Sequence, residues 1–286
     1  MQKKKVLIIG INSFLGKAIF NYAKEEFDIS AVYHRNTENI PDGLELVQAN
    51  DMEQLKGRQF QYIFLVSSYI PLNGIEVDDQ KLIDANIQLP KTVCKLFPSA
   101  RVLFCSSVSV YERSIWDKVI SVSSTIPAPQ SRYAISKLWG EQIIAGHPSY
   151  AIIRISSMYG IGMKSTTFIP RIIESACSTG EINLLGNGER LQNYIHVNDV
   201  AQIAIRSVKS RKNLLLHAVG HQSYSNKQIA EKIATITSCQ VTYSGTDNTP
   251  SYHYDNNQTI IKLGAFNYKN IDEGLKELIE WSKRKF

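Results

Sequence analysis

Residues 6–16 read Val-Leu-Ile-Ile-Gly-Ile-Asn-Ser-Phe-Leu-Gly: an apolar run, a glycine turn and the start of a helix. The continuous apolar run at 6–9 is typical of a parallel strand that is buried on both faces. Gly10 allows a tight turn, and Gly16 allows the following helix to pack closely on the strand. The N-terminus of such a helix presents free N–H groups to a pyrophosphate. The stretch therefore predicts dinucleotide binding, although a strand–turn–helix without a ligand would use the same residues.

The alternation of strand and helix continues as far as about residue 155. Short apolar runs predict further strands at 29–33, 44–48, 62–66, 102–105 and 151–155. Apolar residues at helical spacing predict helices over 15–26, 79–97 and 131–145. Since right-handed crossovers join parallel strands, we expect an α/β fold with a Rossmann-type, doubly wound parallel sheet.

Beyond Arg154 this alternation loosens, and glycine turns interrupt the chain. We therefore expect residues 1–157 and 192–219 to form an NAD(P)-binding Rossmann domain. Residues 158–191 and 220–286 would form a small, interleaved C-terminal lobe that binds the substrate.

The composition excludes several classes of protein. The chain has 286 residues, of which 43% are hydrophobic and 20% charged, so it can fold around its own core. No apolar run approaches the roughly 18 residues of a membrane span, and we expect no signal peptide. The net charge of +6 comes without a dense basic stripe, which argues against nucleic acid and suits an anionic small ligand. The four cysteines are scattered, so we expect no metal site and a cytoplasmic location.

The choice between NAD and NADP depends on the end of the second strand. Proteins that prefer NAD place a carboxylate there for the ribose 2′-hydroxyl, but residues 31–35 read Ala-Val-Tyr-His-Arg. Arg35 would attract a 2′-phosphate, so we favour NADP over NAD; a solvated loop arginine is the alternative. Ser13 replaces the middle glycine of the usual three-glycine turn and is small enough for phosphate to approach. Asp51 could accept a hydrogen bond from the adenine or cap a helix.

Tyr133 and Lys137 lie on one face of the helix expected over 131–145. A tyrosine and a lysine at this spacing are expected about once by chance in this composition, so the context decides their meaning. Ser106 and Ser107 end the preceding strand, and doubly wound sheets bind ligands at the carboxyl ends of their strands. A phenol with a pKa of about 10 is a weak base at neutral pH, so its phenolate needs a nearby positive charge. The arrangement favours acid–base catalysis by a Ser–Tyr–Lys group.

Together these residues resemble the extended short-chain dehydrogenase/reductases, specifically the NAD-dependent epimerase/dehydratase group that acts on nucleotide sugars. The similarity extends over nearly the whole chain. Besides the glycine turn and the Tyr133/Lys137 pair, it is carried by Asn86 and by segments 106–111, 154–160, 186–188 and 193–199.

The resemblance implies a role for each member of the triad. Tyr133 would exchange a proton with the reacting oxygen of the substrate. Lys137 would stabilise the phenolate and bind the cofactor ribose, and Ser107 would hold the reacting oxygen. The implied cofactor-binding residues are Gly10, Asn12, Ser13, Phe14, Leu15, Gly16, Arg35, Asp51, Met52, Val66, Ser67, Ser68, Asn86 and Lys137. The implied substrate-binding residues are Ser107, Val108, Ser157, Arg190 and Gln192.

Departures from the family pattern narrow the range of reactions that we expect this chain to catalyse. Val108 and Ser109 stand where sugar-nucleotide 4,6-dehydratases carry an Asp–Glu pair, and neither can move a proton between sugar carbons. Val108 also stands where GDP-fucose synthases carry a cysteine. Gln192 stands where many members place an arginine on the substrate diphosphate, and Arg190 is the candidate replacement. Glu112 replaces the usual glycine after the Val-Tyr pair.

We therefore expect an NAD(P)H-dependent reductase of a nucleotide-diphosphate-linked 4-keto sugar. The alternative is an NAD-dependent nucleotide-sugar C4 epimerase, which uses the same triad and returns the hydride to the opposite face. A catalytically silent NADP-sensing module would carry a broken triad. The resemblance also implies a role in polysaccharide biosynthesis and a homodimer, in which the helices at 79–97 and 131–145 pair with their copies.

Overall fold

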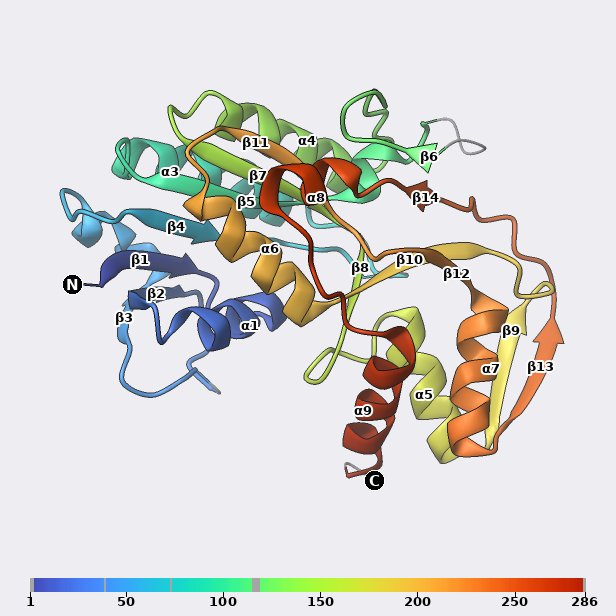
Figure 1. Cartoon of the computed structure of the whole chain (residues 1–286). Coiled ribbons are helices and arrows are strands. Elements are labelled where there is room, and N and C mark those ends of the chain that lie inside the picture. The colour runs from blue at the N-terminus through green and yellow to red at the C-terminus, as the bar shows by residue number, and fades with distance from the viewer. Residues whose placement is uncertain (1–2, 39, 73, 115–118, 285–286) are drawn as a thin grey trace.

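The structure is a computed structural model that describes residues 3–38, 40–72, 74–114 and 119–284. Its largest element is a seven-stranded parallel sheet in the order β11-β7-β5-β4-β1-β2-β3 (Figure 1). The strands are β1 (Lys4–Ile9), β2 (Phe27–Tyr33), β3 (Glu45–Gln48), β4 (Tyr62–Leu65), β5 (Arg101–Ser107), β7 (Tyr150–Ile155) and β11 (Leu214–Ala218). The order reverses between β1 and β4, as in Rossmann-type sheets, so the predicted fold class is confirmed.

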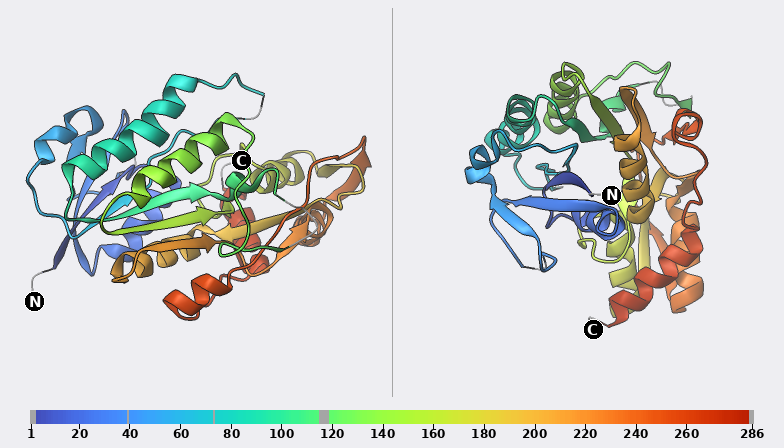
Figure 2. Two further views of the ribbon diagram at one scale, coloured as in Figure 1. Left: turned by 90° about the horizontal axis from the view of Figure 1, so that it is seen from above. Right: turned by 60° about the vertical axis from the view of Figure 1, so that its left-hand side comes forward.

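Helices cover both faces of this sheet, as Figure 2 shows. The longer helices in the described ranges are α1 (Phe14–Ala23), α3 (Leu89–Leu96), α4 (Arg132–Ala145), α5 (Phe168–Ser178), α6 (Val197–Lys209), α7 (Asn226–Thr237) and α9 (Ile271–Lys283). The shorter ones are α2 (Asp79–Ile83), α8 (Asn257–Leu263), the 3-10 turns η1 (Ala49–Leu55) and η3 (Val108–Tyr111), and the π-helical turn η2 (Asp84–Gln88). The helix predicted over 79–97 is therefore divided, because a π turn separates α2 from α3.

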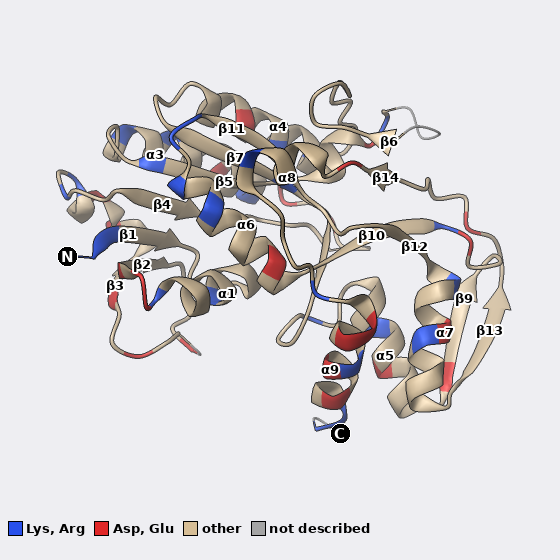
Figure 3. Ribbon diagram, viewed as in Figure 1, with Lys and Arg blue, Asp and Glu red and all other residues tan. Residues whose placement is uncertain are grey.

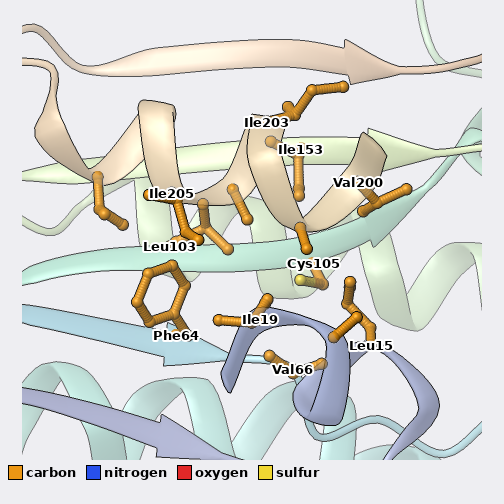
Figure 4. Packing of buried hydrophobic residues seen from close by; sticks show 14 of the residues in the cluster. Leu15, Ile19, Phe64, Val66, Leu103, Cys105, Ile153, Val200, Ile203 and Ile205 are labelled. Carbon is orange, nitrogen blue, oxygen red and sulfur yellow. The ribbon is translucent and has the colours of Figure 1, made fainter. Parts of the chain in front are cut away.

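The side chains of β1 alternate between the two faces, which explains why its apolar run is continuous. Val6 and Ile8 join a core formed with α1 and α6, whose packed side chains are shown in Figure 4. Leu7 and Ile9 join a second core, formed with α3 and α4. Both faces of the sheet are buried, so a ligand-binding site can form only at the ends of its strands, and doubly wound sheets use the carboxyl ends.

A smaller lobe lies beyond that edge (Figure 1). The strands of the described residues outside the seven-stranded sheet are β6 (Val119–Ile120), β8 (Ser157–Tyr159), β9 (Glu181–Leu185), β10 (Leu191–His196), β12 (Ser223–Ser225), β13 (Gln240–Ser244) and β14 (His253–Tyr254). Helices α5, α7 and α9 share one apolar core with β9 and β10. Figure 3 shows both charge signs along α7 and α9, and Lys232 pairs with Asp272 between them at 2.6 Å. Phe14 of α1 packs against both the sheet core and the lobe core, which joins the two.

After β14 the chain returns to the sheet through α8. The Thr259 hydroxyl donates to the His217 carbonyl of β11 at 2.6 Å, and Leu263 packs against the sheet core. Of the helices in the described part of the chain, none combines the length and the apolar character that crossing a membrane requires. The same described residues hold no group of three or more His, Cys, Asp or Glu side chains that could bind a metal ion.

Candidate active site

The turns after β1 and β4 meet where the strand order reverses. Gly10 has a φ of 99°, in the left-handed region, and a Cβ there would lie 2.7 Å from the Ser67 backbone nitrogen. A Cβ on Gly16 would lie 2.3 Å from the Gly10 carbonyl oxygen, so α1 packs directly on the turn. Both glycines are required by close backbone approach, at the position where doubly wound sheets bind their ligands.

The first turn of α1 leaves hydrogen-bond donors available. The Ser13 hydroxyl accepts from the Gly16 N–H at 3.0 Å and donates to the Gly10 carbonyl at 2.7 Å, so in this structure it builds the turn. Within the described residues, the N–H groups of Phe14 and Leu15 have no hydrogen-bond partner. Free N–H groups at the positive end of a helix fit the pyrophosphate of a nicotinamide dinucleotide.

Asn86 lies fully buried in the π-helical turn and holds three elements together. Its amide group donates to the Ser136 hydroxyl of α4 at 3.0 Å and to the Tyr69 carbonyl at 3.2 Å. Its carbonyl oxygen accepts from the Ser68 hydroxyl at 2.9 Å. The loop after β4 is thereby fixed against α4, and such π turns are frequent at functional sites.

The segment after β2 is where the adenosine ribose lies in this class of fold. Arg35 is exposed and makes no hydrogen bond or ion pair within the described residues. Asp78 raises the pKa of Lys81 by a hydrogen bond, and the charge of Arg35 opposes that rise, so two cations lie near one another here. The Asn12 side chain donates to the Asn36 carbonyl at 2.9 Å and ties the glycine turn to this segment.

The other predicted cofactor residues differ in exposure. Met52 and Val66 are buried and pack in the two sheet cores, while Ser67 is half-buried. Asp51 is exposed on η1, and no side chain caps that turn, since Gln48 precedes it without a capping bond. The helix-cap alternative for Asp51 is therefore not realised.

Ser107, Tyr133 and Lys137 come together where β5 ends beside α4. Lys137 is 2% exposed, and its ammonium donates to the Cys105 carbonyl at 2.8 Å. Tyr133, one helical turn earlier, makes a side-chain hydrogen bond with Ser107. The Ser107 hydroxyl also donates to the Ser109 hydroxyl at 3.0 Å. The structure thus brings the three predicted catalytic residues to one place.

Burial determines the protonation of this group. It raises the pKa of Tyr133 to about 12, although the hydrogen bond with Ser107 opposes the rise. Burial lowers the pKa of Lys137 to about 8, which leaves the ammonium protonated at pH 7. In the chain alone, the Lys137 charge does not offset the burial of the phenol. At neutral pH Tyr133 is therefore a proton donor, and its phenolate needs further positive charge.

A pocket of about 160 Å³ opens beside Ser109. It is lined by Val108, Ser109, Glu112, Ser156, Ser157, Arg190, Leu191, Gln192, Asn193, Tyr252 and Tyr254. Val108, Ser157, Arg190 and Gln192 were among the predicted substrate residues, and Ser107 reaches the pocket through its hydrogen bond to Ser109.

Arg190 and Gln192 differ in whether their side-chain hydrogen-bond donors have partners. Arg190 is half-buried, and its Nε has no hydrogen-bond partner within the described ranges. The Gln192 amide group donates to the Asn226 side chain at 2.8 Å. A guanidinium with an unused, buried donor suits an anion such as a diphosphate, so Arg190 is the better placed of the two.

The aromatic wall of this pocket was not predicted from the sequence. The rings of Tyr252 and Tyr254 are stacked, with centroids 6.1 Å apart and an interplanar angle of 23°. Two aromatic residues separated by one position lie on the same face of a strand, so the alternation itself was a usable signal.

A buried polar chain that links α4 to β11 was also missed. Glu141 accepts from the Ser106 hydroxyl at 2.5 Å and pairs with Arg154 at 2.7 Å. Arg154 also donates to the Tyr111 hydroxyl, which lies 2.9 Å from His217 Nε2. Glu141 follows Lys137 by one helical turn, but its burial and its partner come from distant parts of the chain.

Comparison with known proteins identifies the class of this site. Residues 6–219 match the NAD dependent epimerase/dehydratase family. The chain belongs to this family. It is accordingly an enzyme of the NAD(P)-dependent oxidoreductase type, with epimerases among its relatives. One curated relative is the GDP-6-deoxy-D-talose 4-dehydrogenase of Aggregatibacter actinomycetemcomitans, 21% identical over 252 residues that cover 83% of this chain and 81% of the relative.

Solved structures show the same fold for this family member. MoeE5 in complex with UDP-glucuronic acid and NAD has a TM-score of 0.84 and 22% identity, over 99% of this chain and 100% of MoeE5. The UDP-N-acetylglucosamine 4-epimerase of Methanobrevibacter ruminantium M1 has a TM-score of 0.83 and 20% identity, over 100% of both chains. The UDP-glucuronic acid 4-epimerase of Bacillus cereus, in complex with NAD, has a TM-score of 0.85 and 15% identity, over 99% of this chain and 97% of its own.

Proposed function

We propose that this enzyme is an NAD(P)H-dependent reductase of a nucleotide-diphosphate-linked 4-keto sugar. The observation that carries the proposal is the meeting of Ser107, Tyr133 and Lys137 at the end of β5, beside a polar pocket that holds the unused donor of Arg190. Burial raises the pKa of Tyr133, so its phenol carries a proton at pH 7. A protonated phenol can give its proton to a carbonyl oxygen, which is the step that reduction requires. The curated relative is named for a dehydrogenase reaction at position 4 of a GDP-linked sugar, which agrees with this chemistry.

The residues of this chain would carry out the reaction as follows. The N-terminus of α1 would hold the pyrophosphate of the nicotinamide dinucleotide, which in its reduced form would supply the hydride for the carbonyl carbon. Ser107 holds the carbonyl oxygen, and Tyr133 donates its proton to that oxygen as the carbonyl becomes an alcohol. The phenolate left on Tyr133 would be stabilised by the Lys137 ammonium together with the positive charge of the oxidised cofactor, until a solvent proton restores the phenol. One hydride and one proton are consumed, and the products are a secondary alcohol and the oxidised cofactor.

NADP is the cofactor that we propose as preferred, with NAD as the alternative. Arg35 is an exposed cation with Lys81 nearby, and residues 31–35 contain no carboxylate. A 2′-phosphate would be attracted by these charges. MoeE5 and the Bacillus cereus epimerase were solved with NAD, but their identities of 22% and 15% support the fold and leave the cofactor open.

We propose that residues 1–157 and 192–219 hold the cofactor and that 158–191 and 220–286 form the substrate lobe. The packing of α8 on β11 refines this division, because residues 257–263 return to the cofactor side. The cytoplasmic location and the role in polysaccharide biosynthesis stay predictions of the sequence.

A homodimer is proposed from the helices α2 and α4. Three of their apolar side chains are exposed, namely Ile83 at 39%, Ile135 at 46% and Trp139 at 56%. Exposed apolar side chains on neighbouring helices favour association with a second copy. Light scattering should report twice the chain mass at micromolar concentration, and a monomer would contradict the proposal.

Turnover with a panel of 4-keto nucleotide sugars tests the function. The purified enzyme is mixed with each sugar and with NADPH or NADH, and oxidation of the cofactor is followed by absorbance. A reductase consumes one cofactor per sugar and prefers NADPH. A C4 epimerase would instead interconvert the 4-hydroxy sugars with bound NAD and without net cofactor consumption. If no panel member reacts in either assay, the proposal is wrong.

A further inference from the structure

Glu112 lies where the substrate pocket meets the first turn of α4. Its carboxylate accepts from the Ser131 N–H at 2.6 Å, from the Ser131 hydroxyl at 2.7 Å and from the Gln130 N–H at 2.9 Å. Its backbone carbonyl accepts from the Tyr252 hydroxyl at 2.9 Å. One residue therefore connects the start of the catalytic helix to the aromatic wall of the pocket.

The position of Tyr133 depends on this contact. Ser131 is the N-cap of α4, where its hydroxyl accepts from the Ala134 N–H at 3.1 Å, and Tyr133 is in the first turn that this cap begins. A carboxylate at the N-terminus of a helix is stabilised by the helix dipole and by charge-assisted hydrogen bonds. Glu112 thereby fixes the turn from which the phenol projects.

The groups around the phenol come from three elements. Strand β5 contributes Cys105 and Ser107, the segment after η3 contributes Glu112, and α4 itself contributes Lys137, whose ammonium is bonded to the Cys105 carbonyl. Burial raises the pKa of the Cys105 thiol to about 12, so the thiol is neutral at pH 7. Burial is the largest cause of the raised pKa of Tyr133, and the negative charge of Glu112 acts in the same direction.

We propose that Glu112 is a positioning residue for Tyr133: its carboxylate fixes the first turn of α4 and, through its charge, keeps the phenol in the proton-donating form. This proposal rests on the proposed function, because proton donation by Tyr133 is the step that Glu112 would support. The residue would thereby favour reduction, in which Tyr133 must begin protonated.

The test compares Glu112→Gln with Asp79→Asn. Asp79 is a matched control because its carboxylate also contacts the first turn of α4, through Arg132 at 2.8 Å, but does not act on the phenol. Ionisation of Tyr133 is measured by ultraviolet difference titration of the NADP⁺-bound enzyme, with Tyr133→Phe as the blank. This readout needs no sugar, so it stands whether or not the reductase assay succeeds.

Removing the negative charge should make the phenolate easier to form. We expect the Tyr133 midpoint to fall by about 0.5–1 pH unit in Glu112→Gln and to stay unchanged in Asp79→Asn. Glu112→Asp, which keeps the charge, should restore most of the original midpoint and covers the case in which Glu112→Gln does not fold. The proposal would be overturned if the Tyr133 midpoint is unchanged in folded Glu112→Gln. It would also be overturned if the midpoint in Glu112→Asp falls as far as in Glu112→Gln, or if Asp79→Asn shows an equal shift.

Discussion

The cofactor side and the substrate side of this site are built differently. On the cofactor side, the glycine turn, the Ser13 cap and Asn86 come from strand–turn–helix units that are continuous in sequence. On the substrate side, the pocket is lined by four short segments, 108–112, 156–157, 190–193 and 252–254. Local sequence therefore specifies the cofactor side, whereas the substrate side depends on how the segments of the lobe fold back toward the sheet. We expect the choice of substrate to depend on the residues of the substrate side.

The largest expected effect is at the boundary between the two sides. Tyr133→Phe should lower turnover by about 10² to 10⁴, the usual contribution of a positioned acid–base group. Cofactor affinity should hardly change, since the phenol contacts the reacting oxygen. Lys137→Ala should reduce both turnover and cofactor binding, because its ammonium is expected to serve the phenolate and the ribose. Steady-state kinetics and cofactor titration separate these outcomes.

Ser107→Ala provides the graded control for that experiment. It removes the group that orients the oxygen and leaves the proton donor in place, so it should cost less turnover than Tyr133→Phe. Full activity in Tyr133→Phe would place the chemistry elsewhere and reduce the Tyr133/Lys137 pair to a chance match.

A second test addresses the buried pair that joins α4 to the sheet. Glu141 and Arg154 are 3% and 4% exposed, so Glu141→Ala leaves an unpaired buried charge and should cost about 3–5 kcal/mol of unfolding free energy. Glu45→Ala is the control. A hydrogen bond with Arg58 lowers the pKa of Glu45 to about 2, but that pair is 51% and 36% exposed and screened by solvent. The control should cost at most about 1 kcal/mol in urea denaturation, and equal losses would contradict the argument.

The same contrast explains how much the sequence could predict. The strands at 6–9, 29–33 and 151–155 were predicted within a few residues, because a continuous apolar run fixes a buried parallel strand. The Ser107, Tyr133 and Lys137 triad was predicted for a similar reason, since Tyr133 and Lys137 share one helix after a serine-ended strand. The stacked Tyr252 and the buried Glu141–Arg154 pair were not found. The spacing of Tyr252 and Tyr254 was a usable signal for a shared face, but only the folded chain brings that face to the pocket and places Glu141 beside Arg154.

Two arginines allow the two sides to be separated directly. Arg35→Ala should weaken NADP binding by about 1.5–3 kcal/mol, the loss of a charge-assisted hydrogen bond, and should leave NAD binding nearly unchanged. Arg190→Met should raise the KM for the nucleotide sugar about 10- to 100-fold without changing cofactor affinity. Isothermal titration and initial rates measure these effects, with Arg171→Met on the exposed face of α5 as the control. Equal losses of NAD and NADP in Arg35→Ala would show that Arg35 does not discriminate between them.

The smallest expected effect concerns His217, which lies where the two sides meet. It is fully buried, and its Nδ1 lies 2.8 Å from the carbonyl of Asp255, next to Tyr254 of the pocket wall. Burial lowers the pKa of His217 from 6.5 to about 4, and the charge of Arg154 adds to the effect. Between these values the unfolded chain binds a proton that the native chain does not. The stability contributed by neutral His217 is therefore fully present above pH 6.5 and is lost as the pH falls toward 4.

Urea denaturation of the chain and of His217→Gln at pH 7 and pH 5 tests this linkage. Glutamine can still form a hydrogen bond with Tyr111 but does not titrate. Between pH 7 and pH 5, the unfolding free energy of His217→Gln relative to that of the unsubstituted chain should therefore rise by about 2 kcal/mol. Asp199 acts in the opposite direction, because burial raises its pKa from 3.8 to about 6, and its contribution is lost as the pH rises through 6. The contribution of Asp199 is the same in both proteins, so it cancels in the difference between their unfolding free energies. Parallel pH profiles would show that the pKa of His217 is the same in the native and unfolded chains, and would contradict this linkage.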